Sequence, residues 1–206
     1  SYFGNVTDRG EGMKLQDLAS VRSGLVLSRK QSKEPVGYPY RSINLRAIQS
    51  DASINLSEVD VYQAKEPLKS EYLSQKGDII VRLTTPYTAV LIDETTAGMV
   101  ISSNFVVIRI ESQAILPEYL FWLLNTQSVK HDIYENATSN MLGAVNAKFL
   151  AEIEVAVLSI KDQYKLAQIY LSSRHEIRLL KELADEKEKY YAKFLEQTYK
   201  KLKRGK

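Results

Sequence analysis

A run of 43 residues near the C-terminal end, residues 161–203, contains neither proline nor glycine. Asp162 stands near its start, where a negative charge favours the positive end of a helix dipole. One helix of this length would span about 65 Å, far more than a single small domain covers. The sequence therefore predicts one long helix over residues 161–206.

Apolar side chains recur along this run in steps of three and four residues, although Ser173 and Lys187 interrupt the stripe. A helix of this length cannot bury its own stripe, so we expect it to pack on the same helix of a second copy. The alternative is a monomer whose helix folds back on its domain. The predicted dimerisation residues are Leu166, Tyr170, Ile177, Leu180, Ala184, Tyr191 and Phe194.

The remaining sequence predicts one domain over residues 14–160, of the α+β class. Runs rich in β-branched residues, separated by turn residues, favour a mixed, mostly antiparallel sheet. Pro117 suits a first helical turn, and the apolar spacing after it predicts a buried helix. The expected elements are strands at 78–83, 89–92, 104–110 and 149–158, a helix or strand at 14–21, a short strand leading to residue 45, a helix at 118–125 and a polar loop at 136–146.

The first twelve residues are polar and rich in glycine, and an amphipathic stretch begins at Met13. We interpret residues 1–13 either as a leader ahead of a natural start at Met13 or as a flexible N-terminus.

Composition excludes several classes of protein. There is no cysteine and there are only two histidines, His131 and His175, so neither a disulfide framework nor a metal site is expected. No apolar run approaches the roughly 18 residues of a membrane span. We therefore expect a cytoplasmic protein that does not enter a membrane.

No catalytic motif stands out either. The sequence lacks a phosphate-binding glycine loop, and residues 84–87 match the tetrapeptide of amino-methyltransferases too poorly to count. Asp93 and Glu94 are adjacent, so in a strand they would point to opposite faces, and a solvated turn is the better interpretation. We expect no catalytic residue, no metal and no cofactor.

Charge is distributed unevenly along the chain. Residues 1–160 carry 15 basic and 18 acidic side chains, whereas residues 161–206 carry 13 and 7. Within the first part, residues 22–46 hold six basic side chains against the single acidic Glu34. A concentrated basic segment in an acidic domain is what a localised contact with phosphates requires, although a basic loop is also common on solvated surfaces.

Five segments together resemble the specificity subunit of type I restriction-modification enzymes, in an order and spacing that extend over residues 14–204. They are LQDLASVRSG at 15–24, GDIIVR at 77–82, ISSNFVVIR at 101–109, LPEYLFWLLN at 116–125, and DQ at 162–163 leading to AQI at 167–169. Two departures are evident. The family usually has a double proline where this chain has residues 157–160, and a complete subunit has two recognition domains and two helices, whereas this chain has one of each.

The resemblance implies a non-catalytic chain that directs methyltransferase (modification) and restriction subunits to double-stranded DNA. It also implies that such a half acts as a homodimer whose antiparallel helices separate two recognition domains, so that a two-fold symmetric pair reads an interrupted palindrome. We expect Arg29, Lys30 and Lys33 to contact phosphates, and Arg41, Asn44 and Arg46 to lie nearer the groove. Further predicted DNA contacts are Arg82, Thr84, Thr85 and Tyr87 in one exposed turn, and Asn136, Thr138, Ser139, Asn140 and Lys148 in a second polar loop.

A competing hypothesis is a structural adaptor whose coiled helix joins protein partners and whose domain binds no DNA. The mildly acidic domain favours it. A gel-shift assay against random duplex DNA, with and without added salt, separates the two.

Overall fold

The computed structural model describes residues 12–33, 37–139 and 145–204. Backbone contacts divide the chain into two compact units, the first ending at Ala167 and the second beginning at Gln168. The boundary predicted at residues 160 and 161 lies at the start of helix α4 (Ile160–Arg204), seven residues before this division.

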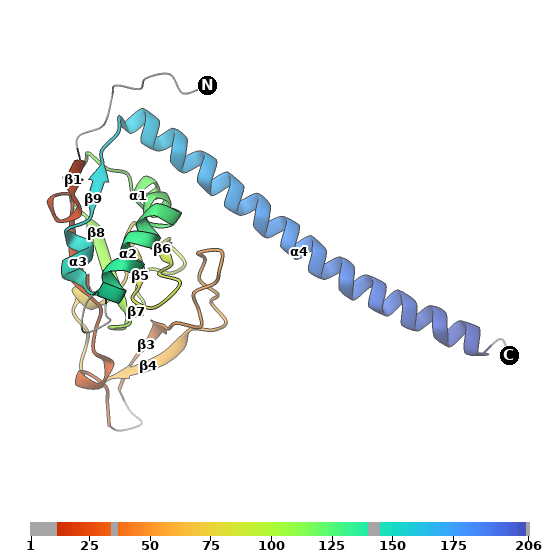
Figure 1. The fold of residues 1–206 in the computed structure, drawn as a ribbon. Coiled ribbons are helices and arrows are strands. Elements are labelled where there is room, and N and C mark those ends of the chain that lie inside the picture. Colours follow the sequence, from red (N-terminus) through yellow and green to blue (C-terminus); the bar gives the residue numbers. More distant parts are fainter. Residues whose placement is uncertain (1–11, 34–36, 140–144, 205–206) are drawn as a thin grey trace, which may run out of the picture. The chain divides into compact units, whose positions relative to one another are not determined.

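The first unit is built on a four-stranded antiparallel sheet (Figure 1). Its strand order is β2 (Ala19–Ser23), β8 (Phe105–Ile110), β5 (Ile79–Arg82) and β6 (Ala89–Leu91). The β-branched runs of the sequence thus form strands with the predicted positions. Side chains of the central pair, β5 and β8, are almost completely buried, which is why these runs are apolar at consecutive positions.

A second, three-stranded sheet has the order β4 (Asp60–Ala64), β3 (Tyr38–Ile43) and β7 (Val100–Ile101). The first pair is antiparallel and the second is parallel. A third pair, β1 (Gly12–Lys14) with β9 (Glu154–Ala156), is antiparallel. The predicted α+β class with a mixed, mostly antiparallel sheet is confirmed, although the strands are divided among three sheets.

Apolar side chains of the two larger sheets form a common core. Because β3 and β7 contribute alongside β5, β6 and β8, the core fixes the β3–β4 pair to the larger sheet. Its buried members are Ile43, Ile48, Ile80, Val90, Ile92, Met99, Ile101, Phe105 and Val107.

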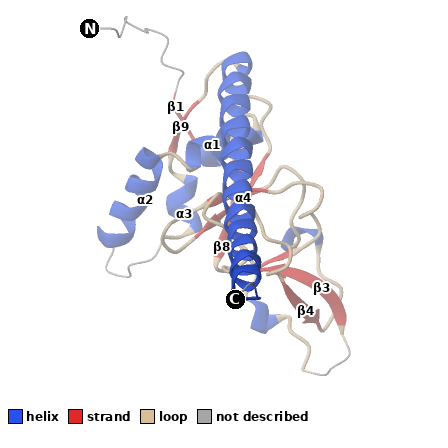
Figure 2. Cartoon of the chain, turned by 90° about the vertical axis from the view of Figure 1, so that its right-hand side faces the viewer, coloured by secondary structure: helices blue, strands red, loops and turns tan. Residues whose placement is uncertain are grey.

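Three helices follow the sheets: α1 (Pro117–Leu124), α2 (Gln127–Ser139) and α3 (Ala147–Ala151). Short 3-10 turns cover Leu15–Asp17, Leu27–Arg29 and Ser70–Tyr72. Helix α1 contacts β6 and has the predicted proline at its first turn. In both views the β3–β4 pair lies apart from α1, α2 and α3 (Figure 2).

The polar loop predicted at 136–146 is wrong in its first part, because α2 continues to Ser139. Val129, Ile133 and Ala137 repeat every four residues and are buried, so they carry the helix onward. The Thr138 hydroxyl donates to the Tyr134 carbonyl at 3.1 Å, which accommodates this polar side chain within the helix.

The strand predicted at 149–158 is also wrong over half its length. The Asn146 side chain accepts a hydrogen bond from the Phe149 backbone N–H at 3.0 Å and caps α3, and a strand begins only at Glu154. The apolar residues that suggested a single strand instead divide between Leu150 on the helix and Val155 on the strand, both completely buried.

The long helix is confirmed as α4 (Ile160–Arg204), with 45 residues. Its first turn belongs to the first unit, where Gln163 is completely buried. The Gln163 side-chain oxygen accepts from the Leu116 N–H, and its nitrogen donates to the Ala114 and Leu158 carbonyls, each at 2.8 Å. One glutamine therefore anchors the helix start to the segment that precedes α1.

Of the predicted leader, residues 1–11 lie outside the described part of the chain. Gly12 and Met13 belong to β1, where they pair with Ala156 and Val155.

Candidate nucleic-acid interface

The basic segment lies along the C-terminal end of β4. The Ser32 N–H donates to the Gln63 carbonyl, and the Lys65 N–H donates to the Lys30 carbonyl, both at 2.9 Å. These bonds hold Arg29 and Lys33, both exposed, beside the β3–β4 pair. Two of the predicted phosphate contacts thus lie at one end of this pair.

The third predicted phosphate contact is already paired. The Lys30 ammonium donates to the Glu66 carboxylate, and this hydrogen bond raises the pKa of Lys30 and lowers that of Glu66. Both groups face solvent, so the pair adds little to stability. It does reduce the net charge that Lys30 presents.

At the other end of the pair, the residues expected near the groove are held by the loop between β3 and β4. An Arg41 guanidinium nitrogen donates to the Leu56 carbonyl at 3.1 Å, and an Arg46 nitrogen donates to the Asp60 carboxylate at 2.8 Å. Both arginine side chains remain exposed. Each keeps further N–H groups for a ligand.

Asn44 differs from these arginines because it holds the loop itself. Its side-chain nitrogen donates to the Glu58 carbonyl at 2.7 Å, and its oxygen accepts from the Ala47 N–H at 2.9 Å. Most of its hydrogen-bonding capacity is therefore used within the domain.

One face of the β3–β4 pair points outward, and we call it the ribbon face: Pro39, Arg41, Val61 and Gln63. Arg41 is opposite Val61 and Pro39 is opposite Gln63 in the strand register. Val61 is 75% exposed, an unusual position for a valine in a sheet. The opposite face carries Tyr62, which is buried. Guanidinium groups and apolar side chains are the kinds of group that contact base edges in a major groove, and this face presents one of each.

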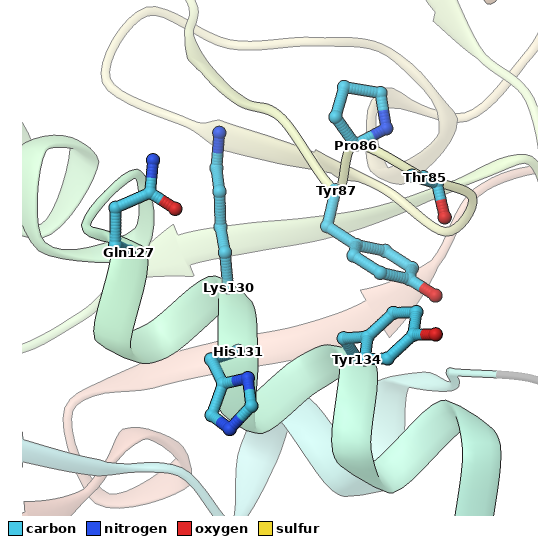
Figure 3. Close-up of a pocket in the computed structure, with 7 residues that line it drawn as sticks. All are labelled: Thr85, Pro86, Tyr87, Gln127, Lys130, His131 and Tyr134. Atoms are coloured by element: carbon cyan, nitrogen blue, oxygen red, sulfur yellow. The ribbon is translucent and has the colours of Figure 1, made fainter.

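Two further predicted residues, Thr85 and Tyr87, help to line an open hollow of about 340 Å³ between the β5–β6 turn and α2 (Figure 3). The rings of Tyr87 and Tyr134 lie one above the other, with their hydroxyls on the same side. The lining residues are Thr85, Pro86, Tyr87, Gln127, Lys130, His131 and Tyr134.

The two walls of the hollow are fixed by the end of α1. The Asn125 side chain donates to the Ala89 carbonyl at 2.9 Å and accepts from the Ala89 N–H at 3.2 Å, which ties the α1–α2 junction to β6. On the other wall, Tyr87 has a φ of 53° and is only 8% exposed. A bulky residue keeps this left-handed conformation only where packing holds it.

Tyr87 was predicted to contact DNA, but most of its ring forms the wall of the hollow. In the same turn the Arg82 Nε donates to the Thr84 hydroxyl at 2.8 Å. Thr84 and Thr85 are exposed, as expected for this turn.

Sequence reasoning did not single out the four α2 residues of the hollow: Gln127, Lys130, His131 and Tyr134. Their spacing of three and four residues, on a different face from the buried Val129, is the signal that identifies them.

The residues predicted for a second polar loop are dispersed. Asn136, Thr138 and Ser139 belong to α2, and Lys148 is exposed on α3. Asn140 lies outside the described residues. Because residues 136–139 and 147–148 are helical, these residues do not form part of a continuous loop.

Within the described residues, no cluster of three or more histidine or acidic side chains is placed to hold a metal ion. Asp93 and Glu94 lie in a turn. Although burial opposes it, hydrogen bonds from Thr95 and Thr96 lower the pKa of Asp93, whose carboxylate caps this turn. None of the described helices is long and apolar enough to cross a membrane.

The second unit consists of the rest of α4. Of the predicted dimerisation residues, Leu166 and Tyr170 are half-buried, and from Ile177 onward they are exposed. The exposed fraction of the large apolar side chains that face solvent on this part of the helix ranges from 46% at Ile177 to 71% at Leu202. Tyr190 stacks on Phe194 with ring centroids 6.1 Å apart.

Solved structures of other proteins have a fold similar to that of this chain. A chain from a study of complex assembly and conformational transition of the type I R-M system matches with a TM-score of 0.61 at 13% identity, over 90% of this chain and 43% of that chain. The HsdS subunit from Thermoanaerobacter tengcongensis matches with a TM-score of 0.59 at 12% identity, over 88% and 41%. The S subunit of the type I restriction-modification system from M. genitalium gives 0.56 at 16% identity, over 86% and 42%.

At these identities the likeness establishes the fold, and the chain spans about two-fifths of the length of these relatives. No curated protein matches the chain. The model of the type I restriction modification DNA specificity domain matches residues 10–186. The chain therefore belongs to the family of type I restriction-modification specificity domains, which is non-catalytic. The resemblance inferred from the sequence is confirmed.

Proposed function

We propose that this chain binds double-stranded DNA sequence-specifically, as half of a specificity subunit that acts as a homodimer on a bipartite site. The observation that carries the proposal is the ribbon face, an exposed two-stranded surface in a member of a DNA specificity family, with cationic side chains at its ends.

The two ends of the β3–β4 pair have different roles in this proposal. Arg29 and Lys33 contact phosphates and supply affinity that depends on salt but not on sequence. Arg41 enters the major groove, where a guanidinium binds guanine in a bidentate manner, and Val61 beside it suits the methyl group of thymine.

Dimerisation follows from the exposed stripe of α4. A 45-residue helix extends about 68 Å, and apolar side chains such as Leu180 and Phe194 are more than half exposed in the single chain. Packing two copies antiparallel covers both stripes and separates two recognition domains. A two-fold symmetric pair then recognises an inverted repeat with a gap of fixed length.

The dimer would direct modification and restriction subunits to this site. Support comes from the similar chain in a structure concerned with assembly of the type I R-M system. Because such a system acts on the DNA of the cell interior, a cytoplasmic location is part of the proposal.

The test measures binding of the full chain to random and selected duplexes by gel shift, at low salt and at 0.3 M salt. Reversing the charges of Arg29 and Lys33 is expected to weaken binding to all duplexes alike, by roughly 10-fold or more for each phosphate that is no longer neutralised. Arg41→Ala is expected to relax sequence preference by about 1–3 kcal/mol at one base pair.

Matched controls are charge reversals of Lys76 and Lys193, exposed lysines outside the ribbon. If the wild-type chain binds no duplex at either salt concentration, the adaptor hypothesis replaces this one. If Arg41→Ala changes neither affinity nor preference, the ribbon is not the reading surface.

A further inference from the structure

We propose that the hollow between the β5–β6 turn and α2 binds a backbone phosphate of the recognised duplex, with Lys130 as its cationic contact. This inference rests on the proposed DNA binding. It adds an anchoring site lined in part by α2, a helix that lies apart from the β3–β4 pair in both views (Figures 1 and 2).

The chemistry of the lining favours an anion. Hydrogen-bond donors come from both walls: the Thr85 hydroxyl on the turn, and Lys130 and His131 on the helix. None of the seven described residues that line the hollow is acidic. Because the lining has hydrogen-bond donors and no carboxylate, the site attracts a phosphate and lacks the acidic ligands that would hold a cation.

The shape favours a nucleotide backbone over an isolated small anion. A volume of about 340 Å³ exceeds the space that one phosphate fills, and the exposed Tyr134 ring provides apolar surface for the attached sugar. The hollow is open to solvent, as a site on a continuous polymer must be.

The walls are also held in place before a ligand arrives. Asn125 bonds to both backbone groups of Ala89 at the turn side, and Ile133 is completely buried on the core side of α2. Ordering the site therefore costs little on binding.

The acidic residues of α2, Asp132 and Glu135, do not line the hollow. Both are displaced from Lys130, by about 160° and 140° around the helix, whereas Glu135, four residues after His131, lies on the same side as that histidine.

The experiment measures how the affinity of the full-length chain for duplex DNA depends on salt, by fluorescence anisotropy with its selected target and with an unrelated duplex. Lys130→Gln is expected to weaken both complexes equally, by roughly 10-fold per copy near 0.1 M salt. It is also expected to reduce the slope of log K against log salt by about 0.9 per copy, or about 1.8 for a dimer. Lys130→Arg keeps the slope, and Gln127→Lys, which adds a cation at the edge of the hollow, steepens it.

The matched control is Lys76→Gln, an exposed lysine that pairs with Glu94 at the opposite end of the β5–β6 hairpin, and it leaves the slope unchanged. An unchanged slope in both Lys130→Gln and Gln127→Lys overturns the phosphate site while wild-type DNA binding stands. A change confined to the selected target also overturns it, because it indicates base reading. If the wild-type chain binds no duplex, the proposed function fails and the site fails with it.

Discussion

The globular unit buries most of its apolar side chains, whereas helix α4 leaves many of its apolar side chains exposed in the single chain. In the sheet domain, Ile79, Ile80 and Val81 of one strand are completely buried. On α4, Leu180 and Leu183 are 58% and 53% exposed in the single chain. Both regions are rich in apolar side chains, yet only the domain has the layers needed to cover them within one chain.

The difference teaches which region can stand alone. A domain that buries its core is stable as a monomer, whereas a long amphipathic helix gains most of its stability from packing its apolar face. The proposed recognition surface therefore lies on the self-contained unit, and the proposed dimer interface lies on the helix. Substitutions in the two regions should separate stability from association.

The largest effect is expected on association. Leu180→Asp with Leu183→Asp removes four leucines from the proposed dimer, worth about 6 kcal/mol or more, so the dissociation constant should rise at least roughly 10,000-fold. Sedimentation measures this change, and urea unfolding of the diluted domain should stay unaltered. The control, Glu182→Ala with Lys189→Ala on the other side of the helix, keeps the dimer. A dimer that survives the aspartates would mean that α4 is not the interface.

A smaller effect, confined to stability, is expected at the ion pair inside the domain. Arg109 donates to both oxygens of Asp78 at 2.8 and 2.7 Å, and the Asp78 side chain is 2% exposed. Burial lowers the pKa of the neighbouring Arg22, and the charge of Arg109 adds to this effect, so Asp78 compensates two cations.

Asp78→Ala leaves these cations uncompensated and should lower the free energy of unfolding by about 3–5 kcal/mol, measured by urea denaturation. Glu94→Ala, at an exposed ion pair, is the control and should change nothing measurable. Equal effects of the two substitutions would contradict the burial argument.

The smallest of the three effects is expected where the two regions join. Gln163→Ala removes three hydrogen bonds of a buried amide and should cost about 2–3 kcal/mol of domain stability. Gln168→Ala, five residues along the same helix and exposed, is the matched control. Indistinguishable unfolding midpoints for the two variants would show that Gln163 does not anchor the helix.

The parts that could be predicted from sequence are those with a long or strong pattern. The β-branched runs indicated β5, β6 and β8, and the absence of proline and glycine from residues 161–203 indicated α4. The end of α2 and the position of α3 could not be predicted, because polar residues such as Thr138 and Asn146 suit both loops and helix ends, and only tertiary burial of Ile133 and Leu150 decides between them.

The candidate site divides in the same way. Arg29, Lys33 and Arg41 belong to one basic segment, so its charge, together with the family resemblance, indicated them. The hollow joins the β5–β6 turn to α2 through Asn125, a contact between residues 36 positions apart in sequence, and no local pattern reveals it. Lys130 was missed for this reason.

The most direct test of the central claim lengthens the helix. Duplicating residues 180–186 adds one heptad, keeps the stripe in register and extends α4 by about 10.5 Å, or up to about 3 base pairs of DNA. Targets selected from a random duplex library by the wild-type and the lengthened chain are then sequenced. The account predicts the same two inverted half-sites in both selections, with a wider gap for the lengthened chain. An unchanged gap, or a single half-site without its inverted partner, would contradict it.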